Sequence, residues 1–412
     1  MTATTLLTTP PTAQGSTRDH DTPPTLHPGL AGVHLATTRL SRVDGERGRL
    51  TLAGFELEEI APQATFEEMI FLLGSGRLPL AGELEALRRA LAERRALPGA
   101  TLDLLRAAAQ RDLDPMEALR MATASLDLAD SVGGTVATIL DAAGLDAAAL
   151  GTLARIPGVV AAFDRLRRGE EPLAPRPELG LAADFLARLR GSEPSAAAVR
   201  ALDTYLCTVV DHGLNASTFT ARVIVATGSD LLSAVVGALG ALKGPLHGGA
   251  PGPALDTVLE IGTPERAEPV LRAKLAAGER LMGFGHRVYR VRDPRAEVLC
   301  QAAAGFFEGG EGAELYALAG HVERVALDLL AEHKPDRKLE TNVEFYTALL
   351  LHGLGLPSDL FTPVFAMGRT AGWIAHGREQ REEGRLIRPR LHYVGPEDRP
   401  WVDVERRSVG TA

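Results

Sequence analysis

The chain of 412 residues contains only two cysteines, and aromatic residues make up just 5% of it. Cys207 and Cys300 provide neither a disulfide framework nor a metal-binding spacing, and so few cysteines are typical of a reducing compartment. We therefore expect a cytoplasmic protein. With so few aromatic side chains, the core must be packed mainly by Ala, Leu and Val.

Long apolar runs and dense positive charge are also missing. No uninterrupted apolar run reaches the ~20 residues that a membrane-spanning helix needs. The net charge is −9, and lysines and arginines form no patch dense enough for nucleic acid. Residues 74–76 (GSG) continue into Arg-Leu-Pro rather than into a phosphate-binding loop, and no HExxH zinc motif occurs. We expect no membrane or nucleic-acid partner and no bound metal.

The overall composition is that of an ordinary globular protein. Hydrophobic residues make up 45% and charged residues 24%, and the length allows two domains. Residues 1–28 are rich in Thr and Pro and lack the apolar core of a secretory signal. We expect them to form a disordered tail.

Hydrophobic periodicity predicts an all-α fold with one small N-terminal β-hairpin. Residues 39–43 alternate, Asp44-Gly45 favours a turn, and residues 50–52 return as the second strand. After that, apolar residues recur at helical spacing, most clearly over residues 83–97, 199–210 and 315–330. Gly and Pro predict breaks at residues 97–99, 156–158, 171–177 and 191–194.

The stretch with the most chemistry is residues 283–295 (GFGHRVYRVRDPR). Two glycines allow a tight turn and a close approach to a ligand, and His286 follows at once. The arginines beside it are suited to carboxylates, because a guanidinium group forms paired hydrogen bonds with them. Taken alone, the stretch also fits a loop histidine beside a solvated run of charge.

Three further stretches bring the same kind of chemistry. His247 lies between Gly-Pro and Gly-Gly in residues 242–250 (LKGPLHGGA), and His212 lies at a helix end in residues 211–217 (DHGLNAS). Glu344 has apolar neighbours in residues 342–346 (NVEFY), although a surface helix glutamate would look similar. Histidines on loops, a partly desolvated acid and arginines together predict an acid–base site for carboxylate substrates.

In this order, the four stretches resemble the citrate synthase family over residues 29–390. The pattern GFGHxV ending in DPR and the pattern GPLHGG are both highly specific. The resemblance implies a large helical domain at residues 29–249 and 360–412, and a small helical domain at residues 250–359 that closes over the cleft. It also implies a homodimer whose active site is shared across the interface.

The resemblance further implies a role for each site residue. The substrates would be oxaloacetate and an acyl-CoA thioester, with no permanently bound cofactor. Glu344 would be the general base, and His247 and His286 would donate to the thioester and keto oxygens. The dicarboxylate would be bound by His212, Arg295, Arg369 and Arg388, the last from the partner subunit, although its charged tail could also be solvated. Candidates for the coenzyme A phosphates are Arg287, Arg290 and Lys338.

The chain departs from the family pattern near the base. The family usually has aspartate in place of Glu344, glutamate in place of Gly213, and Tyr-Pro in place of Glu340-Thr341. One added methylene moves the carboxylate by ~1 Å, which can cost on the order of 100-fold in rate. Three functions stay open: citrate synthase, 2-methylcitrate synthase acting on propionyl-CoA, and a weakly active paralogue that binds dicarboxylate and coenzyme A as a regulator.

Overall fold

The computed structural model describes residues 25–30, 32–128, 137–248, 251–308, 310 and 312–407. The disordered tail predicted for residues 1–28 therefore falls mainly outside the described residues. Contacts divide the chain into one unit of Thr38–Ile387 and a second unit that joins residues 1–37 to residues 388–412.

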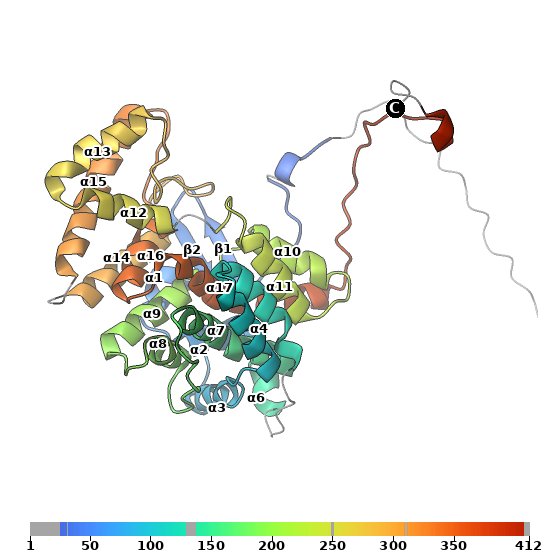
Figure 1. Ribbon diagram of the computed structural model, residues 1–412, viewed down its shortest axis with the longest axis horizontal. Coiled ribbons are helices and arrows are strands. Elements are labelled where there is room, and N and C mark those ends of the chain that lie inside the picture. Colours follow the sequence, from blue (N-terminus) through green and yellow to red (C-terminus); the bar gives the residue numbers. More distant parts are fainter. Residues whose placement is uncertain are drawn as a thin grey trace, which may run out of the picture. The chain divides into compact units, whose positions relative to one another are not determined.

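The larger unit begins with a small antiparallel sheet (Figure 1). Strands β1 (Ser41–Asp44), β2 (Arg49–Leu52) and β3 (Phe55–Glu56) follow one another in the order β1-β2-β3. Val43 pairs with Leu50, and the side chains of Leu50 and Leu52 are fully buried. The predicted hairpin is confirmed, and β3 extends it by a short third strand.

The rest of this unit is helical, which confirms the predicted all-α class. Its α-helices are α1 (Leu57–Ile60), α2 (Phe66–Ser75), α3 (Ala81–Ala92), α4 (Gly99–Gln110), α5 (Pro115–Ala124), α6 (Ala137–Ala142), α7 (Ala147–Arg167), α8 (Leu181–Arg190), α9 (Ala196–Val209), α10 (Ala216–Val225), α11 (Leu231–Leu242), α12 (Pro251–Ile261), α13 (Pro264–Ala276), α14 (Pro294–Phe307), α15 (Ala313–His333), α16 (Val343–Gly353) and α17 (Phe361–Glu383). Two 3₁₀ turns, η2 (Leu126–Leu128) and η3 (Ser358–Leu360), complete it.

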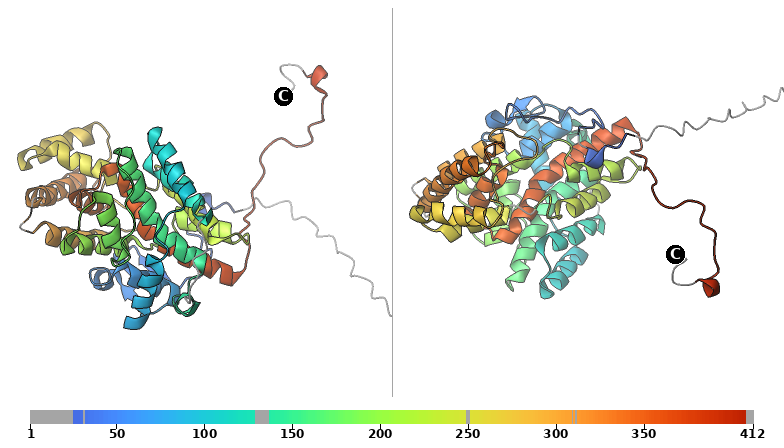
Figure 2. Two further views of the ribbon diagram at one scale, coloured as in Figure 1. Left: turned by 60° about the horizontal axis from the view of Figure 1, so that its bottom comes forward. Right: turned by 90° about the horizontal axis from the view of Figure 1, so that it is seen from above.

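Helix α17 is the element around which the others pack. It contacts α2, α7, α9, α10 and α11, and Figures 1 and 2 show it among them. Its residues are buried almost without interruption from Phe361 to Gly377. A helix that is covered on all sides needs small residues where neighbours approach closely: a Cβ on Gly372 would lie 2.3 Å from the Val210 carbonyl oxygen.

Helix α7 corrects one expectation from the sequence. The break predicted at residues 156–158 is wrong, because α7 continues through Pro157. A proline inside a helix removes one backbone hydrogen bond, but here every residue from Ala149 to Asp164 is buried, and this packing offsets the loss. By length and composition α7 could also cross a membrane, yet 89% of its most apolar 18-residue stretch is buried inside the fold. Its apolar composition is therefore that of a core helix.

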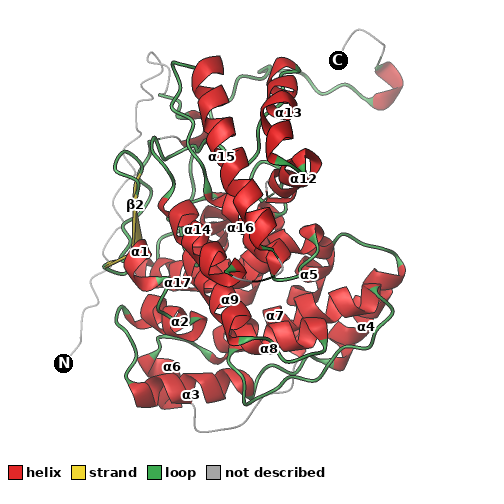
Figure 3. Cartoon of the chain, turned by 90° about the vertical axis from the view of Figure 1, so that its left-hand side faces the viewer, coloured by secondary structure: helices red, strands yellow, loops and turns green. Residues whose placement is uncertain are grey.

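Helices α12 to α16 carry the segment predicted as the small domain. Helix α13 packs against α15, while α12 and α14 pack against α16. Figure 3 shows α12, α13 and α15 together at one end of this unit. Helix α14 also contacts α9, which joins this group to the remaining helices. The boundaries at residues 249/250 and 359/360 stay a prediction.

The second unit contains little regular structure among its described residues. It has two 3₁₀ turns, η1 (Pro28–Leu30) and η4 (Val404–Arg406). The Arg407 guanidinium group lies 4.9 Å from the centre of the Trp401 ring, and the Tyr393 hydroxyl donates to the Pro396 carbonyl oxygen.

Candidate active site

The glycine-flanked loop lies beside the segment that leads to Glu344. Gly283 and Gly285 have φ angles of 92° and 82°, which strongly favour glycine. A Cβ on Gly283 would also lie 2.9 Å from the Phe345 ring. The Gly285 amide donates to the Glu340 carbonyl at 2.7 Å, and the Asn342 amide donates to the Gly283 carbonyl at 2.9 Å. Two stretches far apart in sequence therefore form one short antiparallel pairing.

The His286 ring is fixed by its own loop. Its Nδ1 atom accepts from the backbone amides of Val288 and Tyr289, at 3.0 and 3.1 Å. The proton of the neutral ring is therefore on Nε2. Burial and the nearby Arg295 lower the pKa of His286 to about 4. Near neutral pH the ring is an uncharged donor whose N–H points away from the loop.

Arg295 is held at the start of α14. Its Nε and Nη2 atoms donate to the two oxygens of Asp293, which also caps α14 by accepting from the Arg295 amide. Both side chains are buried, and Arg295 is only 4% exposed. The Arg295 Nη2 atom is 3.2 Å from His286 Nε2. Since both atoms carry protons, an acceptor oxygen to one side of the pair could accept from both.

His212 completes this group together with Tyr289, a residue that the sequence did not single out. The Tyr289 hydroxyl lies 3.1 Å from His212 Nε2, and the centres of the His212 and His286 rings are 5.6 Å apart. Burial, followed by Arg295 and Arg369, lowers the pKa of His212 well below its usual value. Tyr289 therefore contacts one imidazole through its hydroxyl and orients the other through its amide.

Glu344 lies in the first turn of α16, where Asn342 caps the helix by accepting from the Glu344 amide. Its side chain is half-buried, and Val343 and Phe345 on either side are buried. Burial raises the pKa of Glu344 to about 7, although Arg295 opposes the shift. In the described part of the chain, its carboxylate forms no ion pair. Such a group can accept a proton near neutral pH.

Arg369 lies on α17 and is 1% exposed. Its Nε atom donates to the Val209 carbonyl at 2.6 Å, while its Nη2 atom is buried without an acceptor among the described residues. Burial lowers its pKa to about 10, and Asp211 opposes this. A buried guanidinium nitrogen without an acceptor is costly, and a carboxylate ligand would satisfy it.

His247 follows α11, and the Gly249 and Ala250 of its motif lie outside the described residues. Its Nε2 atom is 2.9 Å from the Ser217 hydroxyl, which accepts from Trp373 Nε1 and lies 2.8 Å from Asn215 Oδ1. Burial, followed by Arg369, lowers the pKa of His247 to about 4. This ring is also neutral near pH 7.

A buried acid, Asp211, directly precedes His212 in the chain. Asp211 is fully buried, contacts His376 Nε2 at 3.2 Å and accepts from the Ser41 hydroxyl of β1. Burial alone would raise its pKa, but His376 and its other partners lower it to about 2. The next residue but one, Gly213, has a φ of 60° and donates its amide to the Ser41 hydroxyl. A glutamate, usual for the family here, would be strained in this conformation.

Several predicted residues lie outside this cluster. Arg287, Arg290 and Lys338 are exposed, and Lys338 lies 3.7 Å from Glu340. Among the described residues, their side chains form no hydrogen bond or ion pair with His286 or Glu344, so their role toward coenzyme A stays a prediction. Arg388 is exposed and belongs to the unit that contains residues 388–412, whereas the other site residues belong to the unit Thr38–Ile387.

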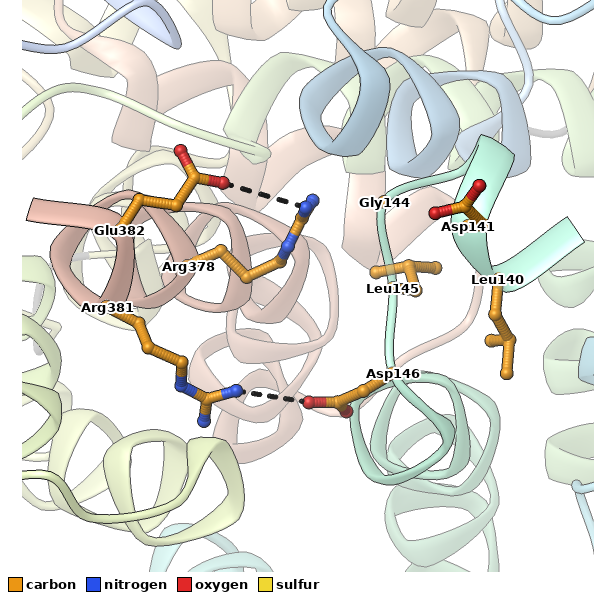
Figure 4. A pocket seen from close by; sticks show the side chains of 8 residues that line it. All are labelled: Leu140, Asp141, Gly144, Leu145, Asp146, Arg378, Arg381 and Glu382. Carbon is orange, nitrogen blue, oxygen red and sulfur yellow. Dashed lines mark hydrogen bonds and ion pairs between the residues drawn. The ribbon is translucent and has the colours of Figure 1, made fainter. Parts of the chain in front are cut away.

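A separate polar pocket contains none of the predicted residues (Figure 4). Its arginines are already paired: Arg381 with Asp146 at 3.4 Å and Arg378 with Glu382 at 3.8 Å. It therefore has no unpaired arginine with which to hold a carboxylate substrate. The pocket is lined by Leu140, Asp141, Gly144, Leu145, Asp146, Arg378, Arg381 and Glu382. Across the described ranges, His, Cys, Asp and Glu form no cluster of three that could hold a metal ion.

A proton acceptor, neutral imidazole donors and buried guanidinium groups on a helical scaffold define an acid–base enzyme site for carboxylates. Residues 29–390 match the family model described as the C-terminal domain of citrate synthase. The chain belongs to the citrate synthase family.

Relatives with known names agree with this assignment. The chain is 42% identical to citrate synthase 2 of Bacillus subtilis over 380 residues, covering 92% of this chain and 99% of the relative. It is 37% identical over 382 residues to the 2-methylcitrate synthase of Mycobacterium tuberculosis, covering 92% and 93%. The fold is similar to citrate synthase from Thermoplasma acidophilum in a ternary complex with carboxymethyl coenzyme A and oxaloacetate. That structure gives a TM-score of 0.82 at 30% identity, covering 93% of this chain and all of the other.

Proposed function

We propose that the protein is a citrate synthase, an acyltransferase that condenses acetyl-CoA with oxaloacetate and hydrolyses the product to citrate and CoA. The observation that carries the proposal is the pairing of the segment that leads to Glu344, whose pKa is near 7, with the loop whose His286 contacts Arg295. The ternary complex of the Thermoplasma relative supports both substrate classes.

Oxaloacetate would bind where donors converge without an acceptor. Arg369 Nη2 has no partner among the described residues, and Arg295 Nη2 faces the N–H of His286. Carboxylate and keto oxygens would supply the missing acceptors, and His212 would contribute from the same cluster. Because the imidazoles are neutral, the positive charge of the site comes from the arginines, which suits a dianion.

Glu344 would take a proton from the methyl group of the thioester. A base is most effective when its pKa is close to the working pH, and burial brings Glu344 to about 7. The electron pair released at this carbon would form the new bond to the keto carbon of oxaloacetate. His286 would then deliver its Nε2 proton to the keto oxygen, which becomes a hydroxyl group.

His247 would stabilise the negative charge that develops on the thioester oxygen. The Ser217 hydroxyl donates to Asn215 Oδ1 and accepts from Trp373 Nε1, so its remaining lone pair accepts the Nε2 proton of His247. Donation to the thioester oxygen from Nδ1 would therefore require the Ser217 proton to turn from Asn215 toward His247 Nε2. Water then hydrolyses the thioester and releases CoA, whose phosphates would be bound by Arg287, Arg290 and Lys338.

The proposal includes a homodimer in the cytoplasm. Arg388 would enter the site of the partner subunit as a further carboxylate ligand, which is consistent with its exposed position. The two free cysteines, of which Cys207 is buried, suit a reducing compartment.

The test is release of free CoA thiol by the purified protein, with and without oxaloacetate, comparing acetyl-CoA with propionyl-CoA. We expect oxaloacetate-dependent release with acetyl-CoA as the better substrate. Preference for propionyl-CoA would instead assign 2-methylcitrate synthase activity, which the mycobacterial relative favours as the second candidate. Binding of oxaloacetate without thiol release from either thioester would refute the enzymatic proposal.

A further inference from the structure

A buried carboxylate on α15 connects three segments that carry the proposed catalytic groups. Glu323 is 8% exposed. Its Oε1 atom accepts from Arg292 Nη1 and from the Thr341 hydroxyl, both at 2.6 Å, and its Oε2 atom accepts from the Tyr346 hydroxyl at 2.5 Å. Glu323 has no role in the proposed mechanism, so the reaction alone does not explain this arrangement.

The donors to Glu323 come from different parts of the site. Arg292 lies on the loop between His286 and Arg295, Thr341 precedes Glu344, and Tyr346 lies two residues after Glu344 on α16. A buried carboxylate is tolerated only when cations and hydrogen-bond donors compensate for its lost hydration. The compensation is therefore supplied by the same segments whose relative positions decide the geometry of the site.

Thr341 is the junction of this arrangement. Its hydroxyl donates to Glu323, while its carbonyl accepts from the Asp293 amide at 3.2 Å. Asp293 in turn holds Arg295 through both carboxylate oxygens. Thr341 also forms an isolated antiparallel bridge with Phe284, two residues before His286. A displacement of Thr341 would be felt at Glu344, at the His286 loop and at Arg295.

We infer that Glu323 is a positioning residue, which acts through Thr341 and Tyr346 to set where the Glu344 carboxylate meets the methyl group of the thioester. The inference deepens the proposed function and rests on it. The family's usual proline in place of Thr341 could not donate a hydroxyl proton. This chain therefore has both the hydrogen bond from Thr341 to Glu323 and the longer side chain of Glu344. The hydrogen bond fixes the segment on which Glu344 lies.

The central test replaces Thr341 by valine, which keeps the shape of the side chain and removes the hydroxyl group. Misplacement of a catalytic group by 1 Å can cost on the order of 100-fold, so a partial loss of position should lower kcat by ~10-fold. The KM for oxaloacetate should change by less than about twofold, because valine keeps the backbone carbonyl that accepts from Asp293, the residue that holds Arg295. Thr341→Ser keeps the hydroxyl group and should retain wild-type kcat.

The matched control is Thr123→Val on α5. Thr123 is as buried as Thr341 and donates to the Leu119 carbonyl at 2.7 Å, away from the site. This variant removes the same group at a similar structural cost and should keep kcat. Tyr346→Phe removes the donor to the other oxygen of Glu323 and should also lower kcat, which provides a second measurement if Thr341→Val does not fold.

Wild-type protein without thiol release in the same assay would refute the proposed function itself, whatever the variants do. With an active wild type, the inference is overturned if Thr341→Val and Tyr346→Phe keep full kcat. It is equally overturned if Thr341→Ser is as slow as Thr341→Val, or if Thr123→Val loses as much kcat as Thr341→Val.

Discussion

Replacing Glu344 by glutamine tests the proposed base and its burial in one variant. Glutamine keeps the size of the side chain but cannot accept the methyl proton. Turnover should fall by roughly 10²–10⁴-fold, the usual contribution of a positioned acid or base. Oxaloacetate affinity, measured by titration calorimetry, should change little because Arg295, Arg369 and the imidazoles are intact.

The same variant should change how stability depends on pH. The pKa of Glu344 is raised to about 7 from a usual 4.5. A raised carboxyl pKa means that folding favours the protonated form, so this contribution is complete below pH 4.5 and is lost as the pH rises through 7. A difference of this size corresponds to about 3 kcal/mol. The Glu344 side chain is only half-buried and keeps part of its hydration, which reduces this value, and we expect about 1–3 kcal/mol.

The measurement is urea unfolding at pH 5 and pH 8, followed by circular dichroism at one protein concentration. From pH 5 to pH 8, the free energy of unfolding of wild type should fall by about 1–3 kcal/mol relative to that of Glu344→Gln, since glutamine never ionises. Glu314→Gln is the control, because Glu314 is exposed on α15. An equal pH dependence for Glu344→Gln and wild type would refute the burial argument. Wild-type turnover in Glu344→Gln would remove this residue from the mechanism.

Four further variants test the geometry of the site. Glu344→Asp shortens the base by ~1 Å and should slow turnover by up to about 100-fold, because the Thr341 segment holds the backbone for a longer side chain; a faster enzyme would contradict this. Tyr289→Phe removes the hydroxyl group at His212 and should raise the KM for oxaloacetate several-fold, by roughly the ~1 kcal/mol that a hydrogen bond contributes. An unchanged KM would mean that this contact does not orient His212. Homodimers of Arg369→Ala and of Arg388→Ala should both be weak, and mixed dimers should regain activity; no recovery in verified mixed dimers would argue against a shared site.

The sequence predicted the class of fold and the ingredients of the site for clear physical reasons. Helical stripes are local, so the helices over residues 199–210 and 315–330 appeared where periodicity placed them, as α9 and α15. The hairpin was equally visible, because Asp44-Gly45 separates two alternating runs. Local rules failed at Pro157, where burial from all sides outweighs the preference of proline for a break.

The sequence could not supply the contacts that connect distant segments. Tyr289 is one residue in a motif until the fold brings its hydroxyl group to His212, 77 residues away. Glu323 belongs to no recognisable motif, because its role depends on hydrogen-bond donors from three other segments. His376 likewise gains its role only when α17 places it against Asp211. Such long-range pairings have no signature in local spacing.

The short pairing between the loop at residues 283–285 and the segment at residues 340–342 has a consequence for dynamics. Its amides, Gly285 and Asn342, and the neighbouring Asp293 amide all donate across the two segments. Such a patch opens as one cooperative unit, so these amides should exchange with deuterium at a common opening free energy. His286 directly follows one of these segments, and Glu344 follows the other. The catalytic arrangement then exists only while the patch is closed, and gentle heating should abolish turnover at the temperature where these amides lose protection, before the helical core unfolds.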